Sequence, residues 1–401
     1  MAGRDSTREG RLCYSGQSMD PRRITASAWV NYFCLFATYA VLTPYLQLYL
    51  KAQGLLPSQI GFLLGELELA GIAGPILLGH LADRRSAYRS FLMAAFIIPV
   101  LMFIPLELAK GFWVYLICIA GMGFAYRAAI PLLDSHVSRI LPDPARQYGT
   151  LRISGSLGFI VVSLMLAAAG FAASSAPRAI AAAFAVTSLI AAAAVFLMPP
   201  SREAHARDAR PAMDGDGFDV KFWLIIAVIF LGRFGIGAYY SFFSLFLKDR
   251  YGLSGVSLIW ALGPLSEILT IYFSGPLIRR FGLRALFIAS LAAISVRLAL
   301  FVIAPSLFMV ALAQVLHAFT FGTFHTASVA YINAKTAPSR RGMGMAIYNA
   351  VAIGLSTFLA STVGGFLLES HGYELLFLSY AAVPLAGIAI LAVRGKKLLA
   401  S

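Results

Sequence analysis

Long apolar segments, separated by short polar ones, make up almost the whole chain after residue 23. Each is about 18 residues or longer, which is the length that an α-helix needs to cross the hydrocarbon core of a bilayer. The pattern therefore predicts an all-α integral membrane protein with twelve membrane-spanning helices. We expect these helices at residues 24–50, 58–81, 89–107, 111–139, 148–173, 176–198, 221–247, 254–278, 283–303, 306–333, 341–368 and 372–394.

One long polar stretch, residues 199–220, divides these helices into six plus six. It is rich in Pro, Asp and Arg, a composition typical of a flexible linker. The halves repeat each other, because Leu50-Lys51 recurs as Leu247-Lys248 and Gly54-Leu55 as Gly252-Leu253. Parallel repeats of this kind are found in secondary transporters, with the solute site between the halves. We predict a tail at 1–23, a first half at 24–198, the linker, a second half at 221–394 and a tail at 395–401.

Composition and charge agree with a membrane protein. Of the 401 residues, 59% are hydrophobic and 12% are charged, which is more apolar surface than a soluble domain of this size buries. If the N-terminus is cytoplasmic, 23 of the 32 Lys and Arg residues fall in cytoplasmic segments, as the positive-inside rule describes. This bias accounts for the net charge of +14 without a nucleic-acid partner, and it predicts that both termini are cytoplasmic.

The segment 262–331 carries ionisable residues in the middle of its predicted helices. They are Glu267, Arg297, His317 and His325. A charge at mid-bilayer costs roughly 2.5–3.5 kcal/mol on insertion scales, so such residues pair within the protein or line a polar cavity. A carboxylate whose Arg partner moves away between conformations takes up a proton, and we expect Glu267 and Arg297 to form such a switch. The alternative for each histidine is a core residue bonded to a helix carbonyl.

The first half carries further ionisable residues that we expect to face a cavity. Asp134 and Arg152 are predicted to pair between neighbouring helices, although Arg152 lies close enough to a helix end to reach the headgroups instead. Arg127 lies seven residues before Asp134 and so shares its helix face. Glu66 and Glu68 are two apart, so at most one of them faces the cavity. In the second half, Arg233 is a further cavity candidate.

A polar loop follows the second predicted helix, with Gly79, Asp83 and Arg84 in the pattern Gly-x-x-x-Asp-Arg. An acid and a base here are able to bridge neighbouring helix ends and hold one conformation. The alternative is that the arginines follow the positive-inside rule while Asp83 caps the helix. The pattern resembles the loop signature of the major facilitator superfamily, although Ala87-Tyr88 stand where that signature has a later Gly.

The motif YGxxRxxGSxGF, at residues 148–159, extends this resemblance. It is similar to the phenylpropionate permease family of the major facilitator superfamily and, more distantly, to lactose permease and the nucleoside–proton symporters. The resemblance implies that Asp134 and Arg152 grip the solute, that Arg297 matches the family arginine of the ninth helix, and that Glu267 and His325 match the phenylpropionate permeases. Thr320 stands where lactose permease has its proton-carrying Glu. Glu267 is therefore the proton carrier we expect here, ahead of Asp134, Glu66 and Glu68.

The sequence thus predicts a proton-coupled symporter in a bacterial inner membrane, acting as a monomer. The favoured cargo is a small polar or anionic organic solute such as an aromatic carboxylate, because buried arginines bind carboxylates bidentately. A sugar or nucleoside symporter, a drug efflux pump and a non-transporting sensor are the alternatives. No cofactor, metal site or enzyme activity is expected, since catalytic triads, HExxH and phosphate-binding loops are absent from the sequence.

Overall fold

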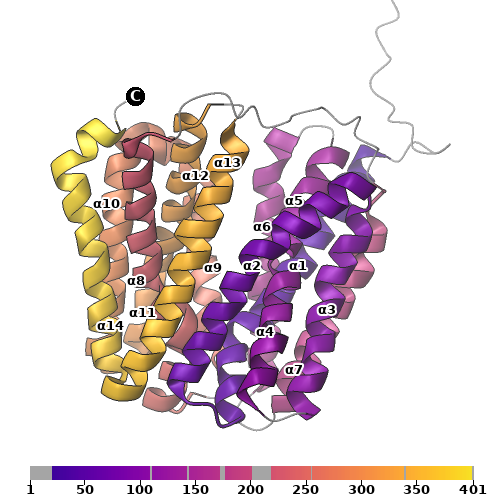
Figure 1. Ribbon diagram of the computed structural model, residues 1–401, viewed down its shortest axis with the longest axis horizontal. Coiled ribbons are helices and arrows are strands. Elements are labelled where there is room, and N and C mark those ends of the chain that lie inside the picture. The colour runs from indigo at the N-terminus through magenta and orange to yellow at the C-terminus, as the bar shows by residue number, and fades with distance from the viewer. Residues whose placement is uncertain are drawn as a thin grey trace, which may run out of the picture.

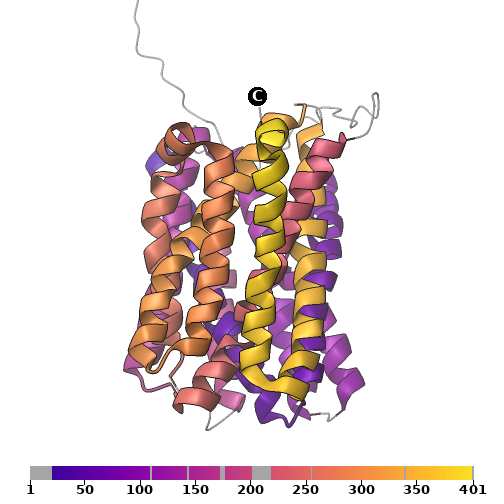
Figure 2. The same cartoon turned by 90° about the vertical axis from the view of Figure 1, so that its left-hand side faces the viewer.

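The computed structural model describes residues 20–108, 111–141, 144–171, 177–200, 218–253, 255–337 and 340–399. All regular elements in these residues are helical. The helices form two bundles that lie side by side, the first from indigo and magenta segments and the second from pink to yellow ones (Figure 1). Figure 2, with the second bundle toward the viewer, shows its helices running along the same direction. The change from one bundle to the other falls between α7 and α8, and the exact domain bounds stay a prediction.

The helices of the first bundle are α1 (Pro21–Ala52), α2 (Pro57–Arg85), α3 (Tyr88–Leu108), α4 (Phe112–Tyr126), α5 (Ala129–Ile140), α6 (Pro144–Ala168) and α7 (Pro177–Ala194), which continues as the 3-10 turn η1 (Val195–Leu197). Those of the second are α8 (Val220–Tyr251), α9 (Ser257–Tyr272), α10 (Ser274–Ile303), α11 (Leu307–Ala313), η2 (Gln314–Leu316), η3 (Ala318–Thr323), α12 (Phe324–Lys335), α13 (Arg341–Ile347), η5 (Tyr348–Leu355) and α14 (Ser356–Leu399). Segments η3 and η5 are π-helical.

Ten helical stretches in the described part of the chain are long and apolar enough to cross a membrane, and α9 is a shorter apolar helix. Two of the long elements, α10 and α14, contain a non-helical glycine, Gly282 with φ 73° and Gly372 with φ 79°. A left-handed glycine breaks the helix there. Both glycines lie where the sequence predicts a boundary between helices. The count of twelve crossings stays a prediction.

Several helix ends differ from the predicted ones because capping groups extend the helices. Asp20 accepts a hydrogen bond from the backbone of Arg22, and Pro21 occupies the first turn, so α1 begins inside the predicted tail. Asp219 caps α8 in the same way by accepting from the Phe222 N–H at 2.8 Å. Helix α14 reaches Leu399, so most of the predicted tail at 395–401 is helical. Residues 201–217 of the predicted linker lie outside the described residues.

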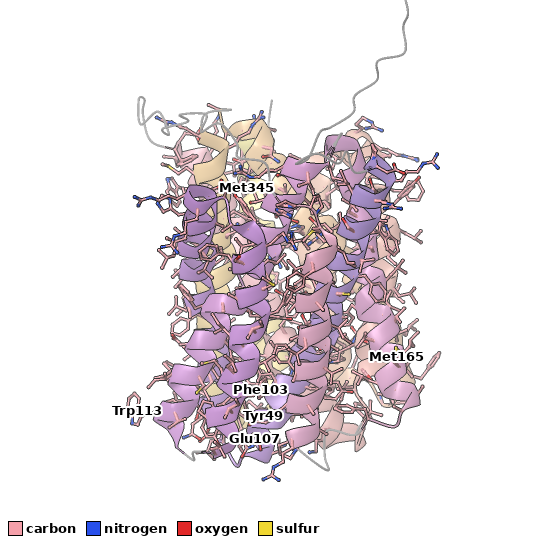
Figure 3. The ribbon with its side chains drawn as sticks, turned by 90° about the vertical axis from the view of Figure 1, so that its right-hand side faces the viewer. Tyr49, Phe103, Glu107, Trp113, Met165 and Met345 are labelled. Carbon is pink, nitrogen blue, oxygen red and sulfur yellow. The ribbon has the colours of Figure 1, made fainter. Side chains whose placement is uncertain are left out.

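The outer surface of the bundle carries large apolar side chains, as a lipid-facing surface does. Trp113 and Met165 are 71% and 63% exposed and project from the edges of the molecule (Figure 3). Tyr49, Phe103 and Glu107 instead gather inside the first bundle, where the Tyr49 hydroxyl donates to Glu107 at 2.9 Å (Figure 3). The protein is thus a multi-helix membrane protein with an apolar outer surface and polar contacts such as Tyr49–Glu107 inside the bundle.

The two bundles approach each other closely along α2 and α14. A Cβ atom added at Gly61 would overlap the carbonyl oxygen of Ser361, and one added at Gly365 would lie 2.5 Å from the carbonyl oxygen of Pro57. Glycines therefore allow the two backbones to touch. This contact lies at the end of the bundle away from Pro21 and Leu399, which we call the distal end. In Figure 1 the distal end is at the bottom, where the ribbons of the two halves run close together.

Polar groups also join the halves at the distal end. Lys51 of α1 donates to both carboxylate oxygens of Asp249 on α8, at 2.5 and 2.7 Å, and Tyr373 donates to the same carboxylate at 2.7 Å. The Ser58 N–H, in the first turn of α2, donates to Glu369 at 3.0 Å. We call these five residues the distal clamp. Two acids of the second half thus hold a lysine and a helix N-terminus of the first half.

We predict that Lys51→Asp loosens the distal end, because it places two carboxylates in contact across the halves. A partly exposed ion pair is worth up to about 1 kcal/mol, so the ratio of separated to closed molecules should change up to about fivefold. Spin labels at Leu56→Cys and His371→Cys, in a chain whose three native cysteines are replaced by Ser, would report the separation by pulsed electron paramagnetic resonance. The matched control is the charge-swapped double variant Lys51→Asp/Asp249→Lys, which should restore the original distance distribution. Identical distributions in all three proteins would contradict a holding role for this pair.

Candidate functional site

Three ionisable side chains from three segments of the second half form a connected chain. Arg297 of α10, which is fully buried, donates through Nη1 to Nδ1 of His317 at 3.1 Å. Nε2 of His317 lies 3.4 Å from Oε2 of Glu267 on α9. We call Arg297, His317 and Glu267 the first cluster. Arg297 and Glu267 are connected through the imidazole of His317 in this arrangement, and the switch expected of the two stays a prediction.

The contacts of the first cluster define the tautomer of His317. A guanidinium only donates, so Nδ1 of His317 accepts and its proton is on Nε2, directed to Glu267. The other carboxylate oxygen of Glu267 accepts from the Ser156 hydroxyl of α6 at 3.4 Å. Ser156 belongs to the first half and to the YGxxRxxGSxGF motif. Glu267 is therefore the point where the first cluster touches the opposite half.

The other terminal nitrogen contacts of Arg297 are to neutral groups, while its Nε has no hydrogen-bond partner among the described residues. Its Nη1 also donates to Thr320 at 2.9 Å, and its Nη2 donates to Gln314. The guanidinium carbon lies 4.0 Å from the centre of the Tyr239 ring, a cation–π contact. Gln314 was not among the predicted site residues, although a polar residue three positions before a buried histidine is a signal for it.

A second cluster surrounds Arg233 of α8. Its Nη2 donates to the Tyr348 hydroxyl at 3.1 Å and lies 3.5 Å from Nδ1 of His325. The Tyr348 hydroxyl and Nδ1 of His325 are 2.9 Å apart. We call Arg233, Tyr348 and His325 the second cluster. Tyr348 was not predicted, and nothing in its apolar sequence surroundings separates it from a packing tyrosine.

One aromatic ring links the two clusters. Phe321 stacks on His317 on one side and on His325 on the other, with interplanar angles of 12° and 8°. The three residues follow at intervals of four, so they lie along one face of η3 and α12. Segment η3 is π-helical, and such segments are frequent at functional sites. The backbone thus presents both histidines in one row. Neither histidine has the helix-carbonyl bond considered as its alternative among the described residues.

In the first half, Glu68 of α2 forms an ion pair with Arg127, which follows α4. The side chain of Arg127 fills space that Gly71 leaves open, because a Cβ there would lie 2.5 Å from its Cγ. The regular helix is interrupted at Arg127 and Ala128, between α4 and α5, but Phe112–Ile140 still forms one membrane-length stretch, close to the predicted 111–139. Of the two glutamates on α2, Glu68 is thus the one that faces α4.

Asp134 and Arg152 each contact an aromatic residue of α1. Tyr32 of α1 donates to Asp134, and the guanidinium of Arg152 lies over the ring of Phe36 at 4.8 Å. Their mutual pairing stays a prediction. Glu66 is partly buried, and its carboxylate has no hydrogen bond or ion pair among the residues that the structure describes.

The residues predicted to form a polar loop, Gly79, Asp83 and Arg84, lie instead in the last two turns of α2, which runs to Arg85, and they form a link within the first half. Asp83 pairs with Arg139 of α5 at 2.5 Å and accepts a hydrogen bond from Tyr88. Arg139 also lies over the Tyr88 ring at 4.9 Å. Arg84 is exposed, and Gly79 has open space around it. The base that Asp83 bridges to is therefore Arg139, and a gating role for these residues stays a prediction.

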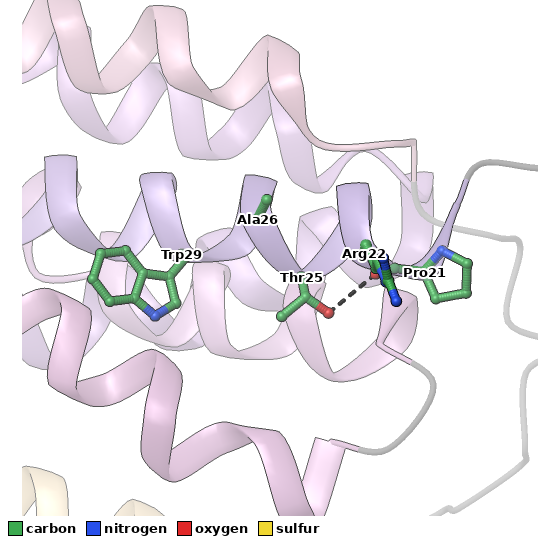
Figure 4. Close-up of a pocket in the computed structure, with 5 residues that line it drawn as sticks. All are labelled: Pro21, Arg22, Thr25, Ala26 and Trp29. Atoms are coloured by element: carbon green, nitrogen blue, oxygen red, sulfur yellow. Dashed lines mark hydrogen bonds between the residues drawn. The ribbon is translucent and has the colours of Figure 1, made fainter.

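Other features of the described residues offer no comparable site. A shallow hollow at the start of α1 is lined by one helix alone, where Thr25 donates to the carbonyl of Pro21 at 3.1 Å (Figure 4). No group of three or more His, Cys, Asp or Glu side chains is arranged for a metal within the described ranges. The two clusters in the second half, with Ser156 opposite, are thus the best-defined polar site.

One protein family and several named relatives match most of the length of this chain. The MFS_1 like family matches residues 27–379, which is most of the chain. The chain belongs to this family of major facilitator transporters. It is 25% identical to the probable 3-phenylpropionic acid transporter of Escherichia coli K12 over 375 residues, covering 90% of this chain and 96% of that one. It is 26% identical to the maltose permease of Geobacillus stearothermophilus over 371 residues, covering 91% and 93%.

The fold is also that of a solved transporter. The crystal structure of a single-substitution mutant of the nucleoside transporter NupG matches with a TM-score of 0.79 at 16% identity, covering 92% of this chain and 99% of that one. The resemblance predicted from the sequence is confirmed at the level of the family and the fold. The roles of individual residues stay predictions.

We predict that Gly322→Ala destabilises this protein by separating α9 from η3. A Cβ at Gly322 would lie 2.5 Å from Oγ1 of Thr270, which donates to the Ala318 carbonyl, and 3.2 Å from Cβ of Glu267. Overpacking of this kind costs typically about 1–3 kcal/mol. Thermal unfolding in detergent should show a lower midpoint than for the wild type. The control is Gly342→Ala in α13, where no atom lies within 4 Å of an added Cβ. Equal midpoints for both variants would contradict the close packing at Gly322.

Proposed function

We propose that this protein is a proton-coupled symporter that imports a small organic solute, with an aromatic carboxylate as the favoured cargo. The observation that supports coupling best is the first cluster, in which a buried carboxylate, Glu267, is linked to Arg297 through His317 and touches Ser156 of the opposite half. Membership of a transporter family supports the general class. The proposal concerns the coupling ion, the direction and the cargo.

The coupling step follows from the position of Glu267 between the halves. Burial favours the neutral carboxyl, whereas a nearby positive charge and donated hydrogen bonds favour the carboxylate. In this arrangement Glu267 accepts a hydrogen bond from Ser156 through Oε1, and its Oε2 lies 3.4 Å from Nε2 of His317. A rocking movement that withdraws Ser156 removes one of these stabilising contacts. The proton affinity of Glu267 then differs between the two orientations of the halves, which is the requirement for proton-driven transport.

The row of aromatic and cationic groups beside Glu267 supports an organic acid as cargo. The relative named as a probable 3-phenylpropionic acid transporter covers almost the whole chain, and Arg233 lies over the rings of Phe321 and Phe324. A sugar is the second candidate, because a maltose permease is a relative of similar identity and coverage. We place the protein in a bacterial inner membrane with cytoplasmic termini, acting as a monomer.

We predict that Glu267→Gln abolishes uphill accumulation but leaves solute exchange intact. The amide keeps the size and hydrogen-bonding capacity of the side chain but does not take up a proton. Proteoliposomes with an imposed inward proton gradient and labelled 3-phenylpropionate, maltose or uridine would measure accumulation, and counterflow would measure exchange. Glu374→Gln, at an exposed ion pair with Arg250, is the matched control and should retain both activities. Accumulation by Glu267→Gln at the wild-type level would remove Glu267 as the coupling site.

A further inference from the structure

The two clusters of the second half each contain an arginine and a histidine, but only the first cluster contains a carboxylate. In each, an arginine lies within hydrogen-bonding distance of Nδ1 of a histidine, and the two histidines stack on opposite sides of Phe321. In the first cluster the histidine then contacts Glu267. In the second cluster no carboxylate pairs with Arg233 or His325 among the described residues. The second cluster is an arginine–histidine pair without an acid.

Hydrogen bonding in the second cluster leaves a donor of His325 without a protein acceptor. The Tyr348 hydroxyl accepts from Arg233 at 3.1 Å, so its own proton is available for Nδ1 of His325 at 2.9 Å. Nδ1 then accepts, and the proton of the neutral imidazole is on Nε2. This is the tautomer that His317 adopts toward Glu267. No hydrogen bond of Nε2 is present among the described residues, so His325 presents an unused N–H.

The charge of Arg233 also lacks full compensation. Its side chain is only 7% exposed, and its Nε has no hydrogen-bond partner in the described part of the structure. A buried guanidinium is costly unless it is paired. Glu68 acts on Arg233 electrostatically, but this carboxylate forms its ion pair with Arg127. Arg152 of the first half also acts on His325 electrostatically. The second cluster therefore has a guanidinium nitrogen and an imidazole N–H that no carboxylate of the described residues accepts from.

We propose that the carboxylate of the cargo completes the second cluster, accepting from Nε2–H of His325 and from the guanidinium of Arg233. This inference rests on the proposed transport function and adds its recognition site. The cargo acid takes the place that Glu267 has in the first cluster. Solute and proton are then bound at the two histidines of one row, on either side of Phe321.

The surroundings of the second cluster indicate which part of the cargo accompanies the carboxylate. Phe321 and Phe324 lie under the guanidinium of Arg233, with its carbon 5.4 and 5.9 Å from their ring centres. Phe324 is fully buried and belongs to the core, so the cargo is able to reach only the exposed part of the Phe321 ring, an apolar surface beside the cluster. We therefore infer an aryl-substituted monocarboxylate rather than a polyhydroxylated solute.

The test compares a carboxylate with its uncharged isostere. Binding of 3-phenylpropionate and of 3-phenylpropionamide to the purified full-length protein in detergent would be measured by calorimetry. The wild type should prefer the carboxylate. Arg233→Gln should weaken carboxylate binding by about 10- to 100-fold, the size of one charge-assisted hydrogen bond, and leave amide binding unchanged. Arg280→Gln, which removes an exposed arginine, is the charge-matched control and should bind as the wild type does.

A second variant tests the site without removing charge. His325→Phe keeps the stacking on Phe321 but removes the Nε2–H, and it should also reduce the preference for the carboxylate. The proposal is overturned if the wild type binds the amide as tightly as the acid, or if a folded Arg233→Gln or His325→Phe protein retains the full wild-type preference.

Failure of this inference is distinguishable from failure of the proposed function. Proton-driven accumulation of maltose or uridine without a preference for the acid would retain coupling and remove the carboxylate site. A preference for the acid that Arg233→Gln abolishes, without proton-driven accumulation, would retain the site and remove the coupling.

Discussion

The structure depends on how charges are accommodated inside a bundle whose outer surface is apolar. A buried guanidinium such as that of Arg297 is tolerated only when several partners share its charge. Here Gln314, Thr320 and His317 accept its hydrogen bonds, and Tyr239 lies against its face. These partners are all neutral, so the nearby acid, Glu267, is separated from the fixed positive charge by an imidazole. That separation leaves the carboxylate sensitive to what the opposite half provides.

The backbone makes this arrangement possible through departures from regular α-helix. The π-helical segment η3 positions His317, Phe321 and His325 in one row, and Gly322 allows α9 to approach closely enough for Glu267 to reach His317. The second π-helical segment, η5, begins with Tyr348, which connects Arg233 to His325. Both irregular segments therefore lie where side chains from different helices must meet. Single π-helical turns within helices are frequent at functional sites, and both of these lie beside the polar clusters.

Much of the fold was predictable from the sequence, because hydrophobic length and the recurrence of Gly54 and Gly252 are local signals. Those two glycines both adopt positive φ after α1 and α8, as the repeat predicts. The buried ionisable residues were also identifiable, since each is conspicuous in an apolar segment. Their partners were not. Linear spacing does not indicate that His317 separates Glu267 from Arg297, that Arg127 fills the space beside Gly71, or that Tyr348 joins a cluster, because these contacts depend on the packing of helices distant in sequence.

The two bundles are connected at two levels, and the difference between these levels suggests how movement and protonation are linked. At the distal end, Asp249 and Glu369 hold Lys51 and the first turn of α2 by direct ionic and backbone contacts, and glycines bring α2 against α14. Deeper in the bundle, the contact of Ser156 with Glu267 is a single hydrogen bond of 3.4 Å. Opening of the distal end would separate direct contacts between partly exposed groups, and water is able to replace those contacts. Loss of the Ser156 contact would instead change the surroundings of a buried acid. A rigid rotation of the halves therefore has its energetic cost at the distal clamp and its chemical consequence at Glu267.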